Sequence, residues 1–178
     1  GRTEMVSTIF GDQRADVGTV SFFGQEVTIK HPQKAIKHKV ALVSEDRKLF
    51  GLNILASVKD NLLLVIQEKL TFMGILKDRL GTKLCEEKVS QLQIKIHSKD
   101  QLVGRLSGGN QQKVVFAIWL CGGSQIYIFV EPTVGVDIGA KFEIYKIIED
   151  VLEKGMSVIL VSSYLPEIIG LSHRAMVF

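Results

Sequence analysis

The stretch Leu106-Ser107-Gly108-Gly109-Asn110-Gln111-Gln112-Lys113 decides how this chain is interpreted. A serine and two glycines stand before a helical pattern, so Ser107 is expected to cap a helix over about 110–120. Gly108 and Gly109 permit a tight turn and the close approach of a phosphate, because neither has a Cβ. Backbone N–H groups at a helix start attract anions. An isolated Ser-Gly-Gly is more typical of a plain capped turn than of a phosphate-binding turn. The neighbouring sequence is needed to distinguish the two.

The downstream sequence adds a strand that ends in a carboxylate. The unbroken apolar run Ile126–Val130 predicts a parallel strand buried on both faces. Glu131 follows it directly, and a Gly-Val-Asp turn comes next at 135–137, ending in Asp137. Doubly wound sheets bind ligands at the carboxyl ends of their strands, where a glutamate can orient a water. This order suits nucleotide phosphate chemistry, although Glu131 alone could be an ordinary strand-end carboxylate.

Together these stretches resemble the nucleotide-binding domain of ABC transporters. The Asn-Gln-Gln-Lys continuation at 110–113 resembles the second, C-terminal nucleotide-binding half of bacterial monosaccharide importers of the ribose, galactose and xylose type. The resemblance covers nearly the whole chain. It implies an α/β fold of the P-loop NTPase kind, with a helical subdomain and a small N-terminal β region.

The resemblance also implies a binding role for the glycine turn. In that family it is a signature motif that contacts the γ-phosphate of ATP held by the opposite domain, so it acts in trans. The nucleotide-binding residues expected on this basis are Ser107, Gly108, Gly109, Asn110, Gln111 and Asp137.

The first four residues correspond to the end of a phosphate loop. An intact loop reads Gly-Lys-Ser or Gly-Lys-Thr, with the lysine on the phosphates and the hydroxyl on Mg²⁺. After Gly1, this chain has Arg2 and Thr3 in those places, and Glu4 adds a negative charge near the phosphates. The C-terminal halves of these importers carry the same Gly-Arg-Thr-Glu. We expect the chain to begin inside the motif, as a fragment of a longer protein.

Other positions that bear on the chemistry also depart from the family. Val130 replaces an aspartate that helps to hold Mg²⁺ through water, and valine has no oxygen to offer a metal. Glu131 aligns with the catalytic base. Ser163 stands where most ABC domains have a histidine on the γ-phosphate, and Glu45, in the loop 44–48, replaces a Mg²⁺-sensing glutamine. We therefore expect ATP as the ligand, with Mg²⁺ weakly held in the chain's own site.

Three further positions lose a charge that the family carries: Val134, Ile118 and Tyr164. A divergent copy, a decaying copy and errors in the sequence are all compatible with these changes.

Composition excludes several classes of function. The 178 residues fit one domain, an apolar fraction of 46% can form a core, and a net charge of +3 without a basic block predicts no nucleic-acid partner. The two cysteines lie far apart and the four histidines do not cluster, so no disulfide framework or metal site is expected. The longest apolar run, Val114–Cys121, has eight residues, whereas a membrane-spanning helix needs about 20.

Periodicity and turn residues predict the remaining elements. We expect a strand pair over 20–29 around Gly24, strands over 39–44 and 157–162, a strand starting at Ala175, and helices over 139–153 and near Leu165. A capping box at Ser57, with Asp60 at its third helical position, predicts a helical region to about Leu102 with a possible break at Gly81. The spacing of Leu84, Val89, Leu92 and Ile96 predicts amphipathic packing there. One face of the 139–153 helix should carry Phe142, Tyr145, Ile148 and Leu152.

These expectations divide the single domain into a β-containing core part (1–56), a helical subdomain (57–106) and a part with the signature helix and core (107–178). The leading interpretation is an ATP-binding domain of a sugar importer whose own site is degenerate. Its expected partners are an N-terminal nucleotide-binding half or a second ATP-binding chain, membrane permease subunits reached through loop 44–48 and the segment from Ser57, and indirectly a periplasmic sugar-binding protein. This would place it peripherally on the cytoplasmic face of the bacterial inner membrane.

Two alternatives remain. The first is a non-catalytic interaction module that keeps the ABC fold and has lost nucleotide chemistry. The second is a soluble ABC ATPase of DNA repair or translation. The absence of a long coiled-coil insert and of a basic patch disfavours this second alternative, as does Asn-Gln-Gln after the signature glycines.

Overall fold

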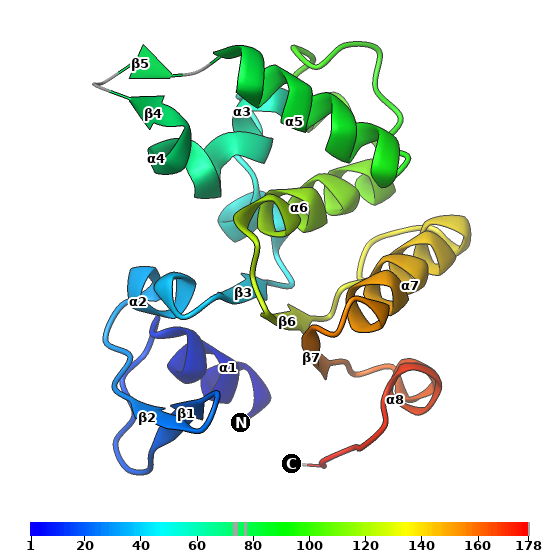
Figure 1. The fold of residues 1–178 in the computed structure, drawn as a ribbon. Helices are drawn as coiled ribbons and strands as arrows, with labels where there is room; N and C mark the ends of the chain where they lie inside the picture. The colour runs from blue at the N-terminus through cyan, green and yellow to red at the C-terminus, as the bar shows by residue number, and fades with distance from the viewer. Residues whose placement is uncertain (73–74, 77, 178) are drawn as a thin grey trace.

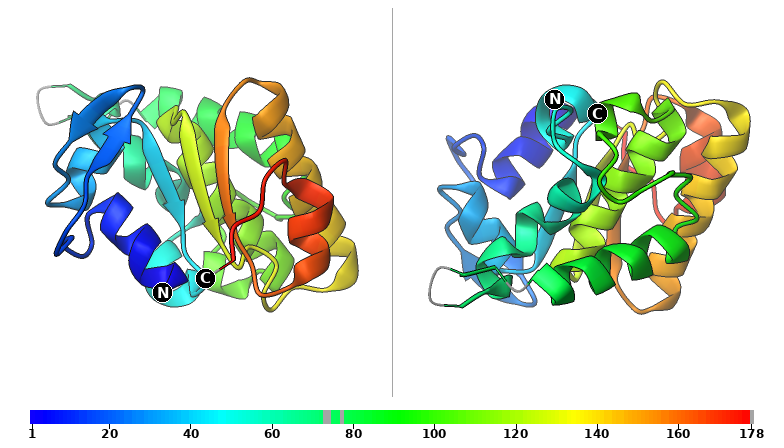
Figure 2. Two further views of the ribbon diagram at one scale, coloured as in Figure 1. Left: turned by 90° about the horizontal axis from the view of Figure 1, so that it is seen from below. Right: turned by 90° about the horizontal axis from the view of Figure 1, so that it is seen from above.

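Three parallel strands form the centre of the molecule. They are β3 (Val40–Val43), β6 (Ile126–Val130) and β7 (Ser157–Val161), hydrogen-bonded in the order β3-β6-β7. Figure 2 shows them side by side, with helices on either side of the sheet. The structure is a computed structural model that describes residues 1–72, 75–76 and 78–177.

The central strand β6 shows why the sheet is buried on both faces. Its side chains alternate, so Tyr127 and Phe129 pack into one apolar cluster, and Ile128 and Val130 pack into another. The first cluster contains α6 (Gly108–Gly122) and α7 (Ile138–Glu153). The second contains α1 (Arg2–Phe10) and α2 (Pro32–Lys37). The predicted α/β class and the predicted strands at the centre of the sheet are confirmed.

The N-terminal β region is a short hairpin. β1 (Val20–Phe22) and β2 (Gln25–Val27) pair antiparallel across Phe23 and Gly24, whose φ angles are 53° and 78°. Two left-handed residues in a two-residue loop match the right-handed twist of a hairpin, which explains the glycine. The predicted strand pair is confirmed over 20–27.

The helical region is more broken than its sequence predicts. It contains α3 (Val58–Leu63), η2 (Leu64–Ile66), α4 (Gln67–Leu70), β4 (Thr71–Phe72), β5 (Ile75–Leu76), α5 (Asp78–Gln91) and η3 (Val103–Arg105). The predicted start is confirmed, because the Ser57 hydroxyl accepts a hydrogen bond from the Asp60 amide at 3.0 Å. Figure 1 shows this region stacked above α6, on the side away from the hairpin.

Two details of that prediction are wrong. Gly81 does not break a helix but lies inside α5, where a Cβ would be 2.7 Å from Leu63 Cδ1, so the glycine serves close packing of α5 on α3. The helix also ends at Gln91 and does not continue to Leu102, because Gln93 takes a left-handed φ of 50° and the Ile94 amide turns back to the Val89 carbonyl. Leu92 and Ile96 still pack against the core from outside the helix.

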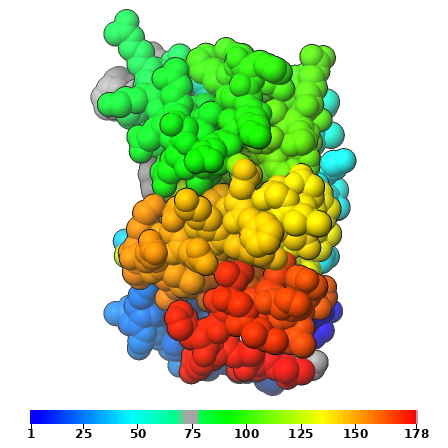
Figure 3. Space-filling model, turned by 90° about the vertical axis from the view of Figure 1, so that its right-hand side faces the viewer, coloured from blue at the N-terminus to red at the C-terminus, as the bar shows by residue number. Residues whose placement is uncertain are grey.

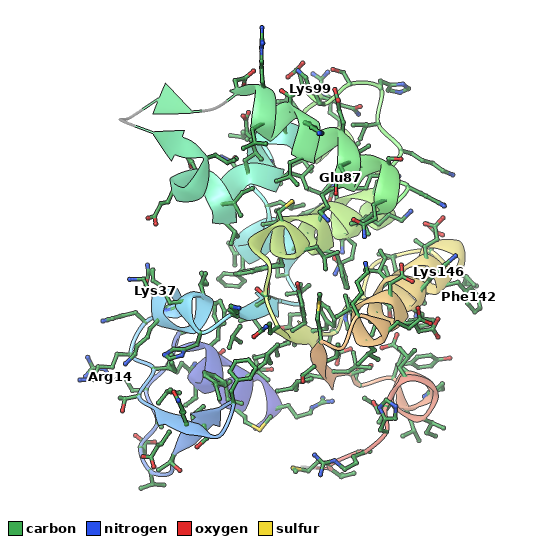
Figure 4. The ribbon with its side chains drawn as sticks, in the orientation of Figure 1. Arg14, Lys37, Glu87, Lys99, Phe142 and Lys146 are labelled. Atoms are coloured by element: carbon green, nitrogen blue, oxygen red, sulfur yellow. The ribbon has the colours of Figure 1, made fainter. Side chains whose placement is uncertain are left out.

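The predicted helix over 139–153 is confirmed as α7, but its predicted face is partly wrong. Phe142 is 68% exposed, and Figure 4 shows it pointing outward near Lys146. The buried stripe contains Ile144 and Ile148, and the core also takes in Val151. Phe142 lies about half a turn from that stripe on a helix of 3.6 residues per turn. Figure 3 shows α7 on the surface, between the green helical region and the red C-terminal segment.

The C-terminal segment is helical before it is irregular. The helix predicted near Leu165 is confirmed as α8 (Leu165–Leu171). The strand predicted from Ala175 is wrong, because residues 175–177 are not in a strand and Met176 and Val177 are exposed. In all views the two chain ends lie near one another (Figures 1 and 2). Among the described residues, no helix combines the length and hydrophobicity that crossing a bilayer requires.

Candidate nucleotide-phosphate site

The helix start at Ser107 is built as the sequence predicts. Ser107 has extended backbone angles and caps α6, and its hydroxyl oxygen lies 3.4 Å from the Asn110 amide nitrogen and 2.9 Å from Asn110 Nδ2. Ser107 is exposed and Gly108 is half-buried, so the positive end of the helix is open to solvent. This start of α6 can therefore accept an anion from outside the chain.

Asn110 and Gln111 face inward rather than outward. Asn110 Oδ1 accepts a hydrogen bond from the Lys95 amide at 2.8 Å, which fixes the segment after α5 to α6. The buried Gln111 donates through Nε2 to the Leu106 carbonyl at 3.1 Å. Both amides thus hold the signature turn in place, and their contact with a nucleotide in trans stays a prediction.

The two signature glycines are required by packing within this chain. A Cβ on Gly108 would lie 2.8 Å from the Gly135 carbonyl oxygen, and a Cβ on Gly109 would lie 2.6 Å from the Cβ of Ala140. Distances under 3.0 Å force the backbone to shift. Asp137 caps α7 beside them, accepting a hydrogen bond from the Ala140 amide at 2.9 Å. The signature and the 135–137 turn are therefore one tightly packed unit.

A buried lysine anchors the same helix further along. Lys113 is 2% exposed, and its ammonium lies 2.6 Å from the Glu143 carboxylate on α7 and donates to the Gln93 carbonyl at 3.0 Å. A buried ammonium is tolerated only when it is paired and hydrogen-bonded. Lys113 thus ties α6 both to the core helix α7 and to the end of the helical region.

Glu131 stands at the carboxyl end of β6 in an unusual conformation. Its φ is 48°, which is rare for a residue other than glycine and is found at functional sites. Its amide donates to the Val161 carbonyl at 2.7 Å, and its carbonyl accepts from the Val134 amide at 3.1 Å. Within the described part of the chain, its carboxylate has neither a hydrogen bond nor an ion pair. A free, half-buried carboxylate at a strand end can accept a proton from water.

The residues that correspond to the phosphate loop are used differently. Arg2 Nη1 donates to the carbonyl of Ser162 at 2.9 Å, at the end of β7. Glu4 is in the first turn of α1, so an acidic side chain stands close to the N-terminus of that helix. Thr3 is exposed. A carboxylate in this place repels a phosphate and satisfies the helix end that a phosphate would use.

The predicted residues fall into two groups. Arg2, Glu131 and the Ser162–Ser163 turn lie at one edge of the sheet, linked through α1, β6 and β7. The signature and Asp137 form the second group, at the start of α6 and α7. Glu45 and Ser163 are exposed, and no described hydrogen bond or ion pair connects either side chain to these groups.

The chain's own strand ends do not fit Mg²⁺. Val130 is 3% exposed and packs in the apolar cluster that contains Val6 and Val161. No three side chains from histidine, cysteine, aspartate or glutamate gather into a metal-binding group among the described residues. Mg²⁺ requires oxygen ligands in near-octahedral geometry, and the position that should supply one is a buried hydrocarbon.

Sequence reasoning missed a buried carboxylate near this edge. Glu167 of α8 is 3% exposed and accepts hydrogen bonds from three hydroxyls. Ser162 Oγ donates at 2.7 Å, Tyr145 Oη donates at 2.8 Å, and Thr133 Oγ1 also donates. Burial, and then the neighbouring Glu167, raise the pKa of Tyr145 to about 12, so its hydroxyl keeps its proton. Glu167 therefore joins the loop after β6, the turn after β7 and α7.

Little in the sequence signals this cluster. Glu167 is the one charge in the otherwise apolar Leu165–Leu171 segment, but its three partners are separated from it by 5, 22 and 34 positions. Arg47 was likewise taken as part of a charged loop, whereas its guanidinium donates to the carbonyls of Val134 and Gly135. The roles of Arg47 and Glu167 can be recognised only in the folded structure, where the strand ends lie close together.

The parallel sheet, the capped helix with its glycine turn, and the carboxylate at the end of the central strand define a nucleotide-binding α/β domain. A family model described as "ABC transporter" matches residues 1–134, and this chain belongs to that family.

The curated relatives are ATP-binding proteins for sugar import. The chain is 43% identical over 178 residues to the xylose import ATP-binding protein XylG of Thermoanaerobacter pseudethanolicus, covering 99% of this chain and 35% of the relative. It is 44% identical over 177 residues to the ribose import ATP-binding protein RbsA of Bacillus cereus, covering 99% and 36%. The chain thus spans about a third of the length of these relatives.

Solved structures agree with the fold. A nucleotide-free ATP-binding cassette from an ABC transporter superimposes with a TM-score of 0.78 at 20% identity, over 97% of this chain and 70% of that one. The cassette MJ0796, solved as a dimer bound to ADP and Pi, gives 0.74 at 19% identity, over 93% and 71%. The α/β fold of an ABC ATPase domain is confirmed.

We predict that Glu167→Gln destabilises the folded chain by about 1–3 kcal/mol. An amide presents an N–H₂ group to hydroxyl donors and leaves at least one of them without an acceptor, which carries a desolvation cost of that size. Glu149 on α7 is exposed, so Glu149→Gln is the matched control and should change stability by no more than about 0.5 kcal/mol. Urea unfolding of both variants measures the difference. Equal midpoints would show that the cluster contributes no stability.

Proposed function

We propose that this chain is an ATP-binding half of a sugar importer and that it acts mainly on ATP held by a second nucleotide-binding half. The observation that carries the proposal is the contrast between its two phosphate-facing helix starts. The start of α6 is capped, exposed and free of acidic side chains in its first turn. The start of α1 carries Glu4, and the adjacent strand ends in Val130.

The proposed site is composite, because this chain contributes its signature to ATP that the partner half holds. Each group of residues has a distinct role in it. Ser107 and the backbone N–H groups of Gly108 and Gly109 would hold the γ-phosphate in trans, with Asp137 fixing the neighbouring turn. In the chain's own site, Arg2, Thr3 and Ser163 would contact the nucleotide weakly, Glu45 would face it from the loop after β3, and Glu131 is the candidate base. ATP supplies the phosphoryl group, and the residues here would bind and orient it.

The relatives support the choice of partners. Those named for xylose and ribose import are about three times as long as this chain, which leaves room for a second nucleotide-binding half. The solved cassette MJ0796 is a dimer, which fits a signature that works in trans. The proposed assembly therefore contains an N-terminal half or a second ATP-binding chain, permease subunits and a periplasmic sugar-binding protein. It would lie at the cytoplasmic face of the bacterial inner membrane.

The interaction-module alternative keeps one specific observation in its favour. Gly108 and Gly109 are explained by internal packing alone, so their presence does not by itself require a phosphate. Nucleotide binding with a defined affinity separates the two proposals. Nothing in the described structure favours a role in DNA repair or translation.

We predict that the purified chain alone does not hydrolyse ATP above the level of its Glu131→Gln variant. Metal placement and γ-phosphate contacts supply most of the transition-state stabilisation in phosphoryl transfer, and this site has a valine, a serine and an acidic helix start in their place. Steady-state phosphate release measures the rate of ATP hydrolysis by the chain and by the variant. Turnover clearly above that of Glu131→Gln would show that the site is competent. Val130→Asp should restore little, because the other defects remain.

For the action in trans, the informative position is Ser107, because a side chain at Gly108 would collide with the chain's own backbone. We predict that Ser107→Asp lowers hydrolysis at the partner's site by about a hundredfold, since it replaces a donor with a carboxylate against the phosphate. Ser107→Asn is the control, because both substitutions keep a good helix cap. The assay uses this chain joined to a nucleotide-binding half with an intact Gly-Lys-Ser or Gly-Lys-Thr loop, here called the paired protein.

ATP affinity should be nearly unchanged in both Ser107 variants, because the partner's own phosphate loop holds the nucleotide. If Ser107→Asp turns over ATP at the unsubstituted rate, the helix start is structural and the interaction module becomes the better proposal.

The membrane contact is proposed for the surface around the loop after β3. Four large apolar side chains are exposed there, namely Leu49, Phe50, Ile54 and Leu55, and Phe50 is 74% exposed. The adjacent charges Glu45 to Lys48 would form the rim, where charge sets orientation and association rate. We predict that Phe50→Asp weakens binding of the paired protein to its permease, with Phe23→Asp in the distant hairpin as the exposed aromatic control. Equal binding of both variants in a pull-down assay would place the contact elsewhere.

A further inference from the structure

Arg47 occupies a fixed position between three stretches that are far apart in the sequence. It opens a short π-helical turn, η1 (Arg47–Gly51), which follows β3. Asp46 caps that turn, because its Oδ1 accepts hydrogen bonds from the Lys48 and Leu49 amides at 3.0 Å each. The cap fixes the backbone from which the Arg47 side chain departs, so its direction is set locally.

The guanidinium spans the turn that precedes α7. Nη1 donates to the Val134 carbonyl at 3.1 Å, and Nη2 donates to the Gly135 carbonyl at 3.2 Å. A Cβ on Gly108 would lie only 2.9 Å from Nη2, so the guanidinium also lies against the first residue of α6. A Cβ on Gly135 would lie 3.5 Å from both terminal nitrogens, which is an ordinary contact, so this glycine is explained by its φ of 69°. One side chain therefore contacts both the signature glycine and the 134–137 turn, which also pack directly on each other.

The charge of Arg47 is not neutralised by a carboxylate. None of the ion pairs in the described part of the chain includes it, and its Nε is buried without a hydrogen-bond partner there. The guanidinium lies beside the positive end of α6, where two groups of like sign repel each other. Two carbonyl dipoles offset part of this repulsion. The Asp137 carboxylate lies on the same side, with its Oδ2 3.9 Å from the position of a Cβ on Gly109, and an anion held in front of Gly108 would add to this offset.

We propose that Arg47 is a positioning residue for ATP hydrolysis at the partner's site. It holds the 134–137 turn against Gly108 so that the turn and the helix start present one rigid surface to the γ-phosphate. The proposal rests on the proposed action in trans. It goes further by assigning a role to a residue of the loop after β3 that touches no part of its own strand-end site. The planar guanidinium is needed for this role, because its two terminal nitrogens donate to two carbonyls at once. A lysine ammonium cannot donate to both carbonyls in this fixed geometry.

The test compares Arg47→Lys and Arg47→Met in the paired protein. Both should lower kcat by about tenfold to a hundredfold, because a displacement of about 1 Å at a reacting group costs up to that much, and both should leave the KM for ATP unchanged. Lys37→Met is the matched control: it removes a charge from an exposed residue of α2 and should leave both constants as they are.

Three outcomes would overturn the proposal. Full activity in Arg47→Lys would mean that charge alone suffices. An equal loss in Lys37→Met would show that removal of any surface charge lowers kcat and that the effect is not specific to Arg47. A raised KM with unchanged kcat would make Arg47 a part of ATP binding. Ser107→Asp separates this failure from that of the proposed function: if it abolishes turnover while Arg47→Lys does not, only the role of Arg47 is wrong.

A second measurement observes the positioning directly in the chain itself. Spin labels on cysteines introduced at the exposed positions Arg105 and Ile138 report the separation of the signature from the start of α7. Burial raises the pKa of both native thiols, Cys85 and Cys121, to about 11, so they label poorly at neutral pH. The distance distribution should be narrow in the native chain and in Lys37→Met, and broad in Arg47→Lys. Equal widths in all three would contradict the proposal even if activity changed.

Discussion

The close packing of the first turn of α6 against the start of α7 is the constraint on which the rest of this structure depends. Gly108 and Gly109 have no room for a Cβ, because the Gly135 carbonyl and Ala140 occupy that space. The signature turn therefore cannot move without moving the turn after β6. Since β6 is the central strand and packs on both faces, the helix start is fixed relative to the whole sheet.

Polar contacts complete that constraint from either side. Asn110 and Gln111 bind the loop segments that lead into the helix, and Lys113 ties the helix to Glu143 of α7. Asn110, Gln111 and Lys113 thus all make hydrogen bonds inside the chain, although Gln111 Oε1 is buried without a partner in the described structure. In the described structure, Ser107 is exposed and Gly108 half-buried at this helix start, which is the geometry that the proposed anion site requires.

The contrast with the chain's own strand ends is electrostatic. At α6 a helix start and Arg47 place positive potential together, and no carboxylate in the described structure pairs with Arg47. At α1 the Glu4 carboxylate lies at the helix start, and the β6 position next to Glu131 is the hydrocarbon Val130. A phosphate therefore finds an attractive surface at one place and a partly repulsive one at the other. This asymmetry is what a composite site with one competent half would show.

The sequence predicted much of this and missed what depends on distant contacts. Glycine turns, caps and apolar runs identified β6, α6 and α7, because these signals are local. The face of α7 was misjudged at Phe142, since an aromatic residue on the outer side looks like a core residue until the neighbouring elements are placed. Gly81 was taken for a break, although it permits close helix packing. Arg47 and Glu167 act through partners 5 to 88 positions away, most of them in other elements, which no local pattern reveals.

The most direct test of the central claim is whether ATP brings this chain onto a second nucleotide-binding half. Sedimentation velocity can follow the chain mixed with a separately expressed half that has an intact phosphate loop and whose strand-end glutamate is replaced by glutamine to block hydrolysis. A signature that acts in trans predicts a one-to-one complex in ATP that is absent in ADP, because only the γ-phosphate reaches Ser107 and Gly108. Equal association in ATP and ADP, or none in either, would contradict it.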